Sequence, residues 1–207
     1  VQKRGPESFI ARTQHYWHRW VNKDIQDFCD LPLELIDLYK HSLLILRTQI
    51  DEDGAIIAAN DADVEHFSLD SYCYMWPRDG SLVANALSHA GYSEITRSFY
   101  DFCNAVLTPD GFLLHKYNPD RSWGSSWHPW IDEQGRTQLA IQEDETALVL
   151  FSLWQHYTCF HDLEFVAPHY RTLVTPAADF LVSFREPHTN LPNASYDLWE
   201  ERRGILT

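Results

Sequence analysis

Apolar side chains recur with a helical period along most of the chain. From Glu7 to about Asn22 they return every three or four residues, and the same spacing continues from Leu31 to Gln49. This period gathers the apolar side chains on one face of a helix. We therefore predict an amphipathic helix in each range, with Pro32 acceptable in the first turn of the second.

The rest of the chain repeats the pattern between turn signals. We predict four further helical segments, at 81–90, 93–107, 142–160 and 163–185, with the last one interrupted near Pro168 and Pro176. A short apolar run at 54–59 predicts a buried extended segment, and 112–137 predicts a long irregular region rich in aromatic rings. Strands and helices do not alternate, so the pattern predicts an all-α fold of about six helices joined by long loops.

Composition narrows the class of protein without naming a function. The 207 residues are 44% hydrophobic and 14% aromatic, with eight tryptophans, which is typical of a globular chain. The formal net charge of −14 argues against nucleic acid or an anionic membrane as a partner. The aromatic rings suit stacking on sugar faces, although most of them are expected in the core.

The four cysteines, Cys29, Cys73, Cys103 and Cys159, do not have the spacing of metal ligands. We interpret them as buried, reduced thiols, and we expect a cytoplasmic protein, with a mature secreted chain as the open alternative. There is no signal peptide at Val1 and no apolar run of about 18 residues, so the sequence predicts no membrane-spanning helix.

Side chains that could carry out catalysis cluster near the C-terminus, in residues 195–204. There, two adjacent carboxylates follow an indole and precede two arginines. Glycosyl transfer needs such a set: a carboxyl group that stays protonated, neighbouring ions that tune it and an aromatic wall for the sugar. A solvated helix start, with Asp197 as N-cap and glutamates in the first turn, explains the same spacing.

Three motifs together resemble one known family. Residues 196–201, Tyr-Asp-Leu-Trp-Glu-Glu, are similar to the general-acid segment of glycoside hydrolase family 15, the glucoamylase family. Residues 72–80 resemble its Tyr-x-x-x-Trp-x-Arg-Asp motif, and 141–147, Ile-Gln-Glu-Asp-Glu-Thr-Ala, give a looser match. The motifs stand in the family's order along the chain, which favours the sugar interpretation over the solvated helix start.

The resemblance implies an architecture that the periodicity alone does not. The family's catalytic domain is an (α/α)6 barrel of twelve helices, with the active site in the loops at one end. The resemblance implies that residues 1–207 form a single partial domain, the first half of that barrel. We also expect that a second half, and an upstream domain, lie outside this chain.

The Tyr72–Gly80 motif implies a sugar-binding pair. By resemblance, Arg78 and Asp79 bind the glucose at the non-reducing end, and the rings of Tyr72 and Trp76 face it. A guanidinium donates and a carboxylate accepts hydrogen bonds in a geometry that suits vicinal hydroxyls. From the residues alone, Asp79 also fits a cap on a helix starting at Ser81, and the two rings also fit a core.

By resemblance, Glu200 is the general acid that protonates the glycosidic oxygen. Such a group needs a raised pKa, which burial or a neighbouring charge provides. Glu201 supplies such a charge and by resemblance contacts substrate hydroxyls. The Trp199 ring is expected to form one side of the site. Exchanged roles for Glu200 and Glu201 stay open.

The remaining candidate substrate-binding residues are Gln142, Asp144, Trp127 and His128. The first two lie at a predicted helix start, where acidic residues are common for electrostatic reasons alone. The segment with Trp127 and His128 departs from the fungal glucoamylase pattern and looks closer to bacterial members. This departure leaves the cleaved linkage open among α-1,4, α-1,6 and trehalose types.

The resemblance implies an exo-acting, inverting α-glucoside hydrolase that needs no metal or cofactor. An inverting enzyme needs a second carboxylate, about 6.5–9.5 Å from the acid, to activate water. In the family this base lies in the second half of the barrel, so we expect this chain alone to be inactive and to pack against that half. The alternative is a non-catalytic glucan-binding or regulatory module, such as occurs in phosphorylase kinase subunits.

Overall fold

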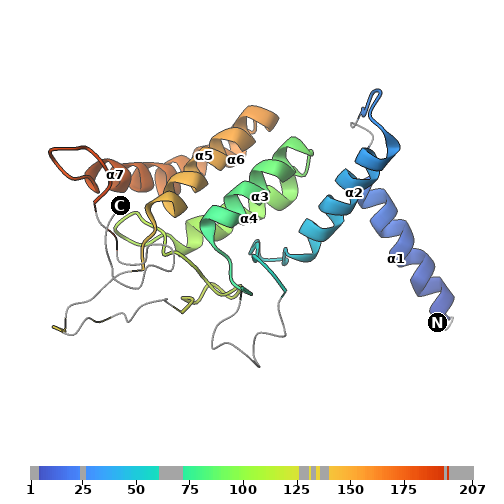
Figure 1. Cartoon of the computed structure of the whole chain (residues 1–207), viewed down its shortest axis with the longest axis horizontal. Helices are drawn as coiled ribbons and strands as arrows, with labels where there is room; N and C mark the ends of the chain where they lie inside the picture. Colours follow the sequence, from blue (N-terminus) through green and yellow to red (C-terminus); the bar gives the residue numbers. More distant parts are fainter. Residues whose placement is uncertain are drawn as a thin grey trace. The chain divides into compact units, whose positions relative to one another are not determined.

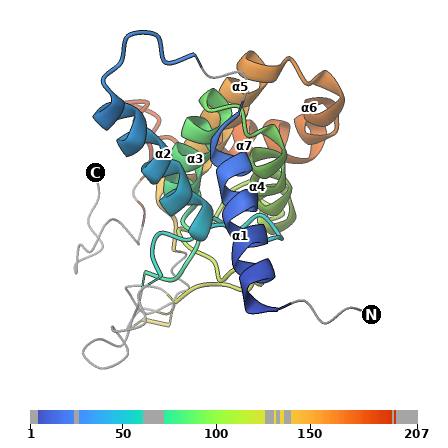
Figure 2. The same ribbon diagram turned by 90° about the vertical axis from the view of Figure 1, so that its right-hand side faces the viewer.

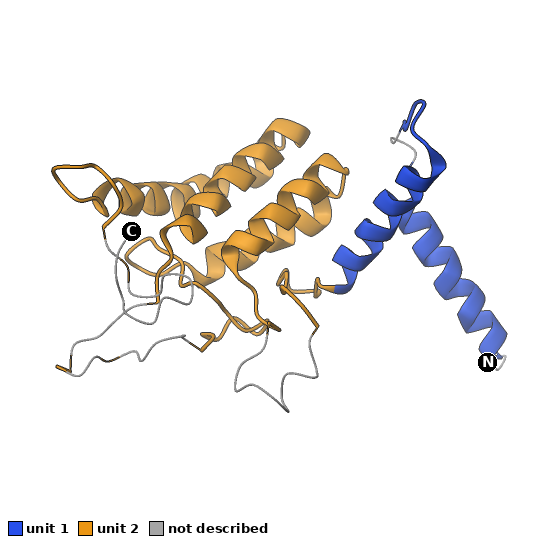
Figure 3. Cartoon of the chain, viewed as in Figure 1, with its two compact units in different colours: residues 1–48 blue, residues 49–207 orange. Residues whose placement is uncertain are grey.

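The structure of the protein is a computed structural model that describes residues 5–23, 27–60, 72–125, 131, 134–135, 140–193 and 195. The chain divides into two compact units, Val1–Thr48 and Gln49–Thr207, which Figure 3 colours separately. That residues 1–207 form a single partial domain remains a prediction.

Unit 1 is a pair of helices, α1 (Pro6–Val21) and α2 (Leu33–Thr48), which Figure 1 draws in blue. Both were predicted within two residues at each end. Lys40 of α2 donates a hydrogen bond of 2.7 Å to Asn22, the residue that ends α1, and its ammonium lies 5.7 Å from the Phe28 ring. These contacts join the two helices at one end.

Unit 2 is also helical. Its elements are α3 (Pro77–His89), α4 (Ser93–Val106), α5 (Glu143–Phe160), α6 (Leu163–His169), the π-helix η2 (Tyr170–Val174) and α7 (Thr175–Ser183). Across the described residues the extended backbone forms isolated bridges and no strand. The prediction of an all-α fold of the (α/α)6 barrel type is therefore confirmed.

The core of unit 2 lies between α3, α4 and α5, which Figure 2 shows in one bundle with α7. Phe99, Tyr100 and Phe102 of α4 are fully buried, as are Leu87 of α3 and Val149 of α5. Burying a large apolar side chain contributes about 1.5–3 kcal/mol relative to leaving it exposed. This packing fixes α3 and α5 against each other and so sets the positions of their first turns.

Helix α3 starts earlier than predicted. We expected a loop at Arg78 and Asp79 and a helix from Ser81, but α3 begins at Pro77. Proline suits the first helical position, because its φ is already helical and its missing N–H has no partner to lose there. Arg78 and Asp79 therefore lie in the first turn, and the prediction that Asp79 caps a helix at Ser81 is wrong.

The predicted interruption in 163–185 is confirmed, although the helix does not break. Residues Tyr170–Val174 widen into a π-helix between α6 and α7. Pro168 and Pro176 lack the N–H that a regular helix uses, and a π turn re-registers the backbone around them. The axis therefore continues from Leu163 to Ser183.

The segment 54–59, predicted to be extended, pairs with other loop segments of unit 2. Bridges join Ile57 to Met75 and Met75 to Tyr117, so three segments distant in sequence lie side by side. Gly54 allows the first of these segments to approach α4 closely. It has φ +93°, and a Cβ there would lie 2.0 Å from the carbonyl oxygen of Ser98 in α4. Any other residue would push the segment away from α4.

The cysteine prediction is partly wrong. All four thiols are free, but only Cys103 is buried, and Cys29, Cys73 and Cys159 are exposed. In the described part of the chain, no helix is both long and apolar enough to cross a membrane.

A buried histidine lies at the other end of the core. His156 of α5 is fully buried among the rings of Tyr100, Phe160 and Phe165, whose centroids lie 4.8–5.5 Å from its own. Its Nδ1 shares a hydrogen bond of 2.9 Å with Thr96 Oγ1. Burial lowers the pKa of His156 to about 4, and Arg97 acts in the same direction while Asp162 opposes it.

The close approach of α3 and α4 predicts the effect of Gly80→Ala. Alanine favours a helix by about 1 kcal/mol over glycine. A Cβ at position 80, however, would meet the buried Phe99 ring at 2.4 Å, and such overpacking costs about 1–3 kcal/mol. We expect chemical denaturation to show a net loss of up to about 2 kcal/mol in the free energy of unfolding. The control is Ala86→Gly at an exposed site of α3, which should lose about 1 kcal/mol. A Gly80→Ala chain more stable than the parent would contradict this packing.

The buried imidazole predicts a loss of stability in mild acid. The unfolded chain binds a proton on this histidine near pH 6.5, whereas the folded chain does so only near pH 4. Between these values the free energy of unfolding falls as the pH falls, by at most about 1.4 kcal/mol per pH unit from this group. His156→Asn, whose amide lies near the position of Nδ1, should flatten the profile measured by denaturation from pH 7 to 4. His188→Gln, at an exposed turn, is the control; equal slopes in all three chains would disprove the assignment.

Candidate active site

An aromatic face leads into α3. The rings of Tyr72 and Tyr74 both lie beside the ring of Trp76, in the segment that leads into α3. The Trp76 ring centroid lies 5.8 Å from that of Tyr72 and 5.7 Å from that of Tyr74. Trp76 is nearly buried, and Tyr72 is half exposed. The segment is held by main-chain hydrogen bonds to 58–59 and to Tyr117.

A buried lysine lies beneath this aromatic face. Lys116 is 1% exposed, and its ammonium lies 4.4 Å from the Tyr74 ring centroid and 5.5 Å from that of Trp76. A cation over an aromatic face is attracted by the ring quadrupole. Gly124 passes so close to the Lys116 stem that a Cβ there would lie 2.7 Å from its Cγ. The loop therefore fixes the position of this charge.

Arg78 lies at the centre of the polar groups, where the first turns of α3 and α5 meet. Its Nη1 donates hydrogen bonds to Gln142 Oε1 at 2.6 Å and to Asp144 at 3.0 and 3.2 Å. Its Nε lies 3.7 Å from Asp79. Burial acts to lower the pKa of Arg78, but the charges of Glu145, Asp144 and Asp79 outweigh it and raise the pKa, so the guanidinium stays charged.

Two of the carboxylates around Arg78 differ in exposure. Asp79 is about half exposed; burial raises its pKa, and the Arg78 charge only partly offsets that shift. Glu145 is fully buried, with Oε1 at 3.3 Å from Arg78 Nη1, and Oε2 accepts a hydrogen bond from the Arg78 main-chain N–H. Burial raises the pKa of Glu145 well above its usual range, although Arg78 acts to lower it.

A pocket of about 640 Å³ opens next to this cluster. Its apolar lining includes Leu181 and Phe184 near the end of α7. Its polar lining among the described residues is Arg78, Gln142, Glu143, Asp144, Arg185 and Asn190. The arrangement offers donors and acceptors with an apolar wall, which is what a sugar requires. Where the chain is described, no group of three or more His, Cys, Asp and Glu side chains is arranged so that it could hold a metal ion.

The structure brings together residues from two of the three motifs. Gln142 and Asp144 contact Arg78 directly, although 64 and 66 residues separate them in sequence. Asp79 lies beside Arg78, while Tyr72 and Trp76 form the adjoining aromatic face. The other predicted site residues, Trp127, His128, Trp199, Glu200 and Glu201, lie outside the described residues.

Sequence reasoning missed three residues of this region. Tyr74 is detectable, since the alternation of rings in 72–76 places it with its neighbours. Glu145 belongs to an acidic helix start, and nothing in the local pattern distinguishes it from half-buried Glu143 or exposed Asp144. Lys116 has no sequence signal either, because its burial depends on the Tyr74 and Trp76 rings, 42 and 40 positions upstream.

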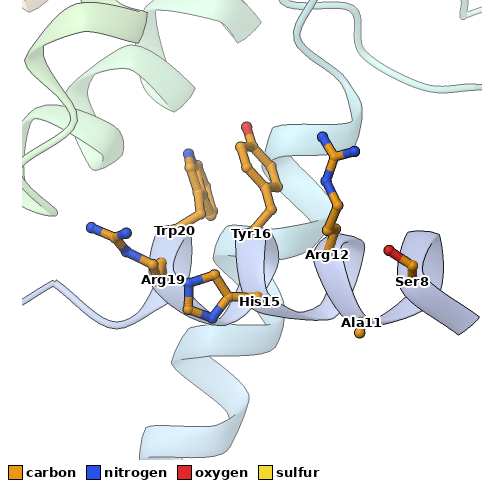
Figure 4. A pocket seen from close by; sticks show the side chains of 7 residues that line it. All are labelled: Ser8, Ala11, Arg12, His15, Tyr16, Arg19 and Trp20. Carbon is orange, nitrogen blue, oxygen red and sulfur yellow. The ribbon is translucent and has the colours of Figure 1, made fainter. Parts of the chain in front are cut away.

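A second hollow lies in unit 1, on the surface of α1, and Figure 4 shows its lining. Tyr16, Trp20 and Arg12 project to one side of the helix, with His15 and Arg19 beside them. None of the described residues lining it is a carboxylate. This hollow therefore does not have the groups that glycosyl transfer needs.

The chain is similar in sequence to known glycosidases. It is 29% identical over 205 residues to an uncharacterized glycosyl hydrolase of Methanocaldococcus jannaschii, covering 97% of this chain and 29% of that protein. It is 26% identical over 174 residues to a glucoamylase of a Clostridium species, covering 81% of this chain and 21% of that protein. The chain thus spans less than a third of the length of these relatives.

Solved structures agree with the sequence comparisons. A glycosidase variant matches with a TM-score of 0.55 and 26% identity, covering 80% of this chain and 43% of the other. A second variant, solved in complex with glucose, matches with the same score, identity and coverage. Residues 36–206, most of the sequence, match the family described as Glycosyl hydrolases family 15. The chain therefore belongs to Glycosyl hydrolases family 15.

Proposed function

We propose that this chain carries the sugar-binding residues and the general acid of an exo-acting, inverting α-glucoside hydrolase. The observation that carries the proposal is the Arg78–Asp79 pair, held at the start of α3 beside an aromatic face and in contact with the start of α5. The guanidinium donates and the carboxylate accepts, so together they fit two neighbouring hydroxyls of a glucose ring.

Family membership supports the sugar ligand. A glycosidase of similar fold was solved with glucose, and a glucoamylase is among the relatives. The half-exposed Tyr72 ring next to Trp76 offers a surface on which a sugar face stacks. We therefore assign the non-reducing-end glucose to the surface formed by Tyr72, Arg78 and Asp79.

The proposed general acid is Glu200. It follows a tryptophan in the Tyr-Asp-Leu-Trp-Glu-Glu motif, and Glu201 next to it supplies a negative charge that favours the protonated form. The proposed mechanism transfers its proton to the glycosidic oxygen while a water attacks the opposite face of the sugar. The water needs a carboxylate base about 6.5–9.5 Å from the acid, which we assign to the second half of the barrel in the whole protein.

Glu200→Gln in the whole protein tests the assignment of the acid. The amide cannot donate the proton, so we expect kcat on maltose to fall about 10²–10⁴-fold. KM should change little, because the amide keeps the shape of the carboxyl group. α-Glucosyl fluoride has a leaving group that scarcely needs protonation, so its hydrolysis should be largely retained. The measurement is steady-state kinetics with both substrates.

Asp79→Asn is the matched control, because it makes the same chemical change in a residue assigned to the sugar. It should lower kcat/KM for both substrates, since both present the same glucose to Asp79. The first product, followed by NMR, should be β-glucose, the inverted anomer. Normal turnover of maltose by the Glu200→Gln protein would contradict Glu200 as the acid, and α-glucose as first product would contradict inversion. A parent protein that binds glucan without cleaving it would favour the regulatory-module alternative.

A further inference from the structure

Glu145 is a fully buried carboxylate to which the proposed mechanism gives no task. Moving an ionised carboxylate out of water costs several kcal/mol unless charges and hydrogen bonds compensate it. A glutamine or a leucine would fill the start of α5 without that cost. The contacts of Glu145 indicate what its charge does there.

Glu145 completes the first turn of α3. The N-cap of α3 is Trp76, which makes no side-chain capping bond, and Pro77 has no N–H. The first N–H groups of a helix have no partner within the helix, so the Arg78 N–H needs an acceptor from elsewhere. Glu145 Oε2 accepts that hydrogen bond across the interface between α5 and α3. It therefore acts as a cap supplied by another helix.

The same carboxylate faces the Arg78 side chain. Its Oε1 lies 3.3 Å from Nη1, the nitrogen that also contacts Gln142 and Asp144. Within the described part of the chain, Oε1 accepts no hydrogen bond, so its interaction with Arg78 is one of charge. One oxygen of Glu145 thus holds the main chain of Arg78, and the other faces the Arg78 guanidinium.

The titratable groups that face Glu145 come from three helices, α3, α4 and α5. Arg78 and Asp79 face it from α3, Asp144 from its own helix and the neutral, buried Cys103 thiol from α4. Only Arg78 is positive among these four groups. A change at Glu145 therefore acts on Arg78 more than on any other neighbour.

We propose that Glu145 is a positioning residue for the sugar site, which sets the orientation of Arg78, and with it the Arg78–Asp79 pair, without touching the sugar. The inference rests on the proposed function, because that pair is the proposed glucose contact. A merely structural role for Glu145 would affect the stability of the protein and leave the use of substrate unchanged.

The test is Glu145→Gln in the whole protein. Glutamine keeps an oxygen for the Arg78 N–H and puts an NH₂ group in place of the oxygen that faces the guanidinium. We expect kcat/KM to fall about 10-fold or more, as is typical when a charge-assisted contact is lost. The loss should be equal for maltose and α-glucosyl fluoride, since the glucose is the same in both. Glu94→Gln is the control: it makes the same change at an exposed site in the first turn of α4 and should leave both rates unchanged.

A double-mutant cycle with Arg78→Lys separates positioning from general damage. Lysine keeps the charge but loses the planar fork, so the orientation set by Glu145 no longer matters. In that background Glu145→Gln should cost at most about 2-fold more, whereas independent effects would multiply. If the Glu145→Gln protein fails to fold by circular dichroism, Glu145→Asp, which keeps the charge on a shorter stem, replaces it with the same expected coupling.

The outcomes distinguish the two proposals. A parent protein that cleaves maltose, with a Glu145→Gln variant that matches its kcat/KM and only melts at a lower temperature, would overturn the positioning role alone. Losses that multiply with those of Arg78→Lys would also overturn it. A parent protein that neither binds nor cleaves maltose would overturn the proposed function, and the positioning role with it.

Discussion

The Arg78 guanidinium lies among three carboxylates at the point where two helices begin, and the rest of the site depends on its charge. A buried Glu145 is tolerated only next to a cation, and a partly buried Arg78 only next to carboxylates. The N-termini of α3 and α5 add partial positive charge at the same place. Burial raises the pKa values of Asp79 and Glu145, and the charge of Arg78 only partly offsets these shifts.

This electrostatic centre can exist because the helices beneath it pack closely. Gly80 lets α3 approach the buried Phe99 ring of α4, and the contact between α3 and α5 brings their first turns within hydrogen-bonding distance. Gly54 has the same role for the extended segment that crosses the loop end. Two positions without a side chain thus allow the backbone to bring residues from distant parts of the sequence to one place.

The sequence predicted the parts of this structure that depend on local spacing. The helices α1, α2, α4 and α5 follow from apolar periodicity, and the resemblance of the motifs pointed to Arg78 and Asp79. The start of α3 was predicted too late, because Pro77 was not recognised as a helix-starting residue. Burial was the weakest prediction. Cys159 was expected inside and is exposed, whereas Lys116 is buried. Burial of a single side chain depends on contacts over many tens of residues, which no local period records.

The contacts that hold the Arg78–Asp79 pair affect how the proposed site selects its ligand. Gln142, Asp144 and Glu145 fix Arg78 before any sugar arrives, so binding need not order that side chain. A fixed donor next to a fixed acceptor favours ligands that present two neighbouring hydroxyls. A ligand that lacks one of them leaves a charged group desolvated and unpaired, and such sites discriminate more strongly than apolar pockets do. Selectivity for the glucose ring would thus reside in α3 and α5, while the cleaved linkage would be set by the loops that face the leaving group.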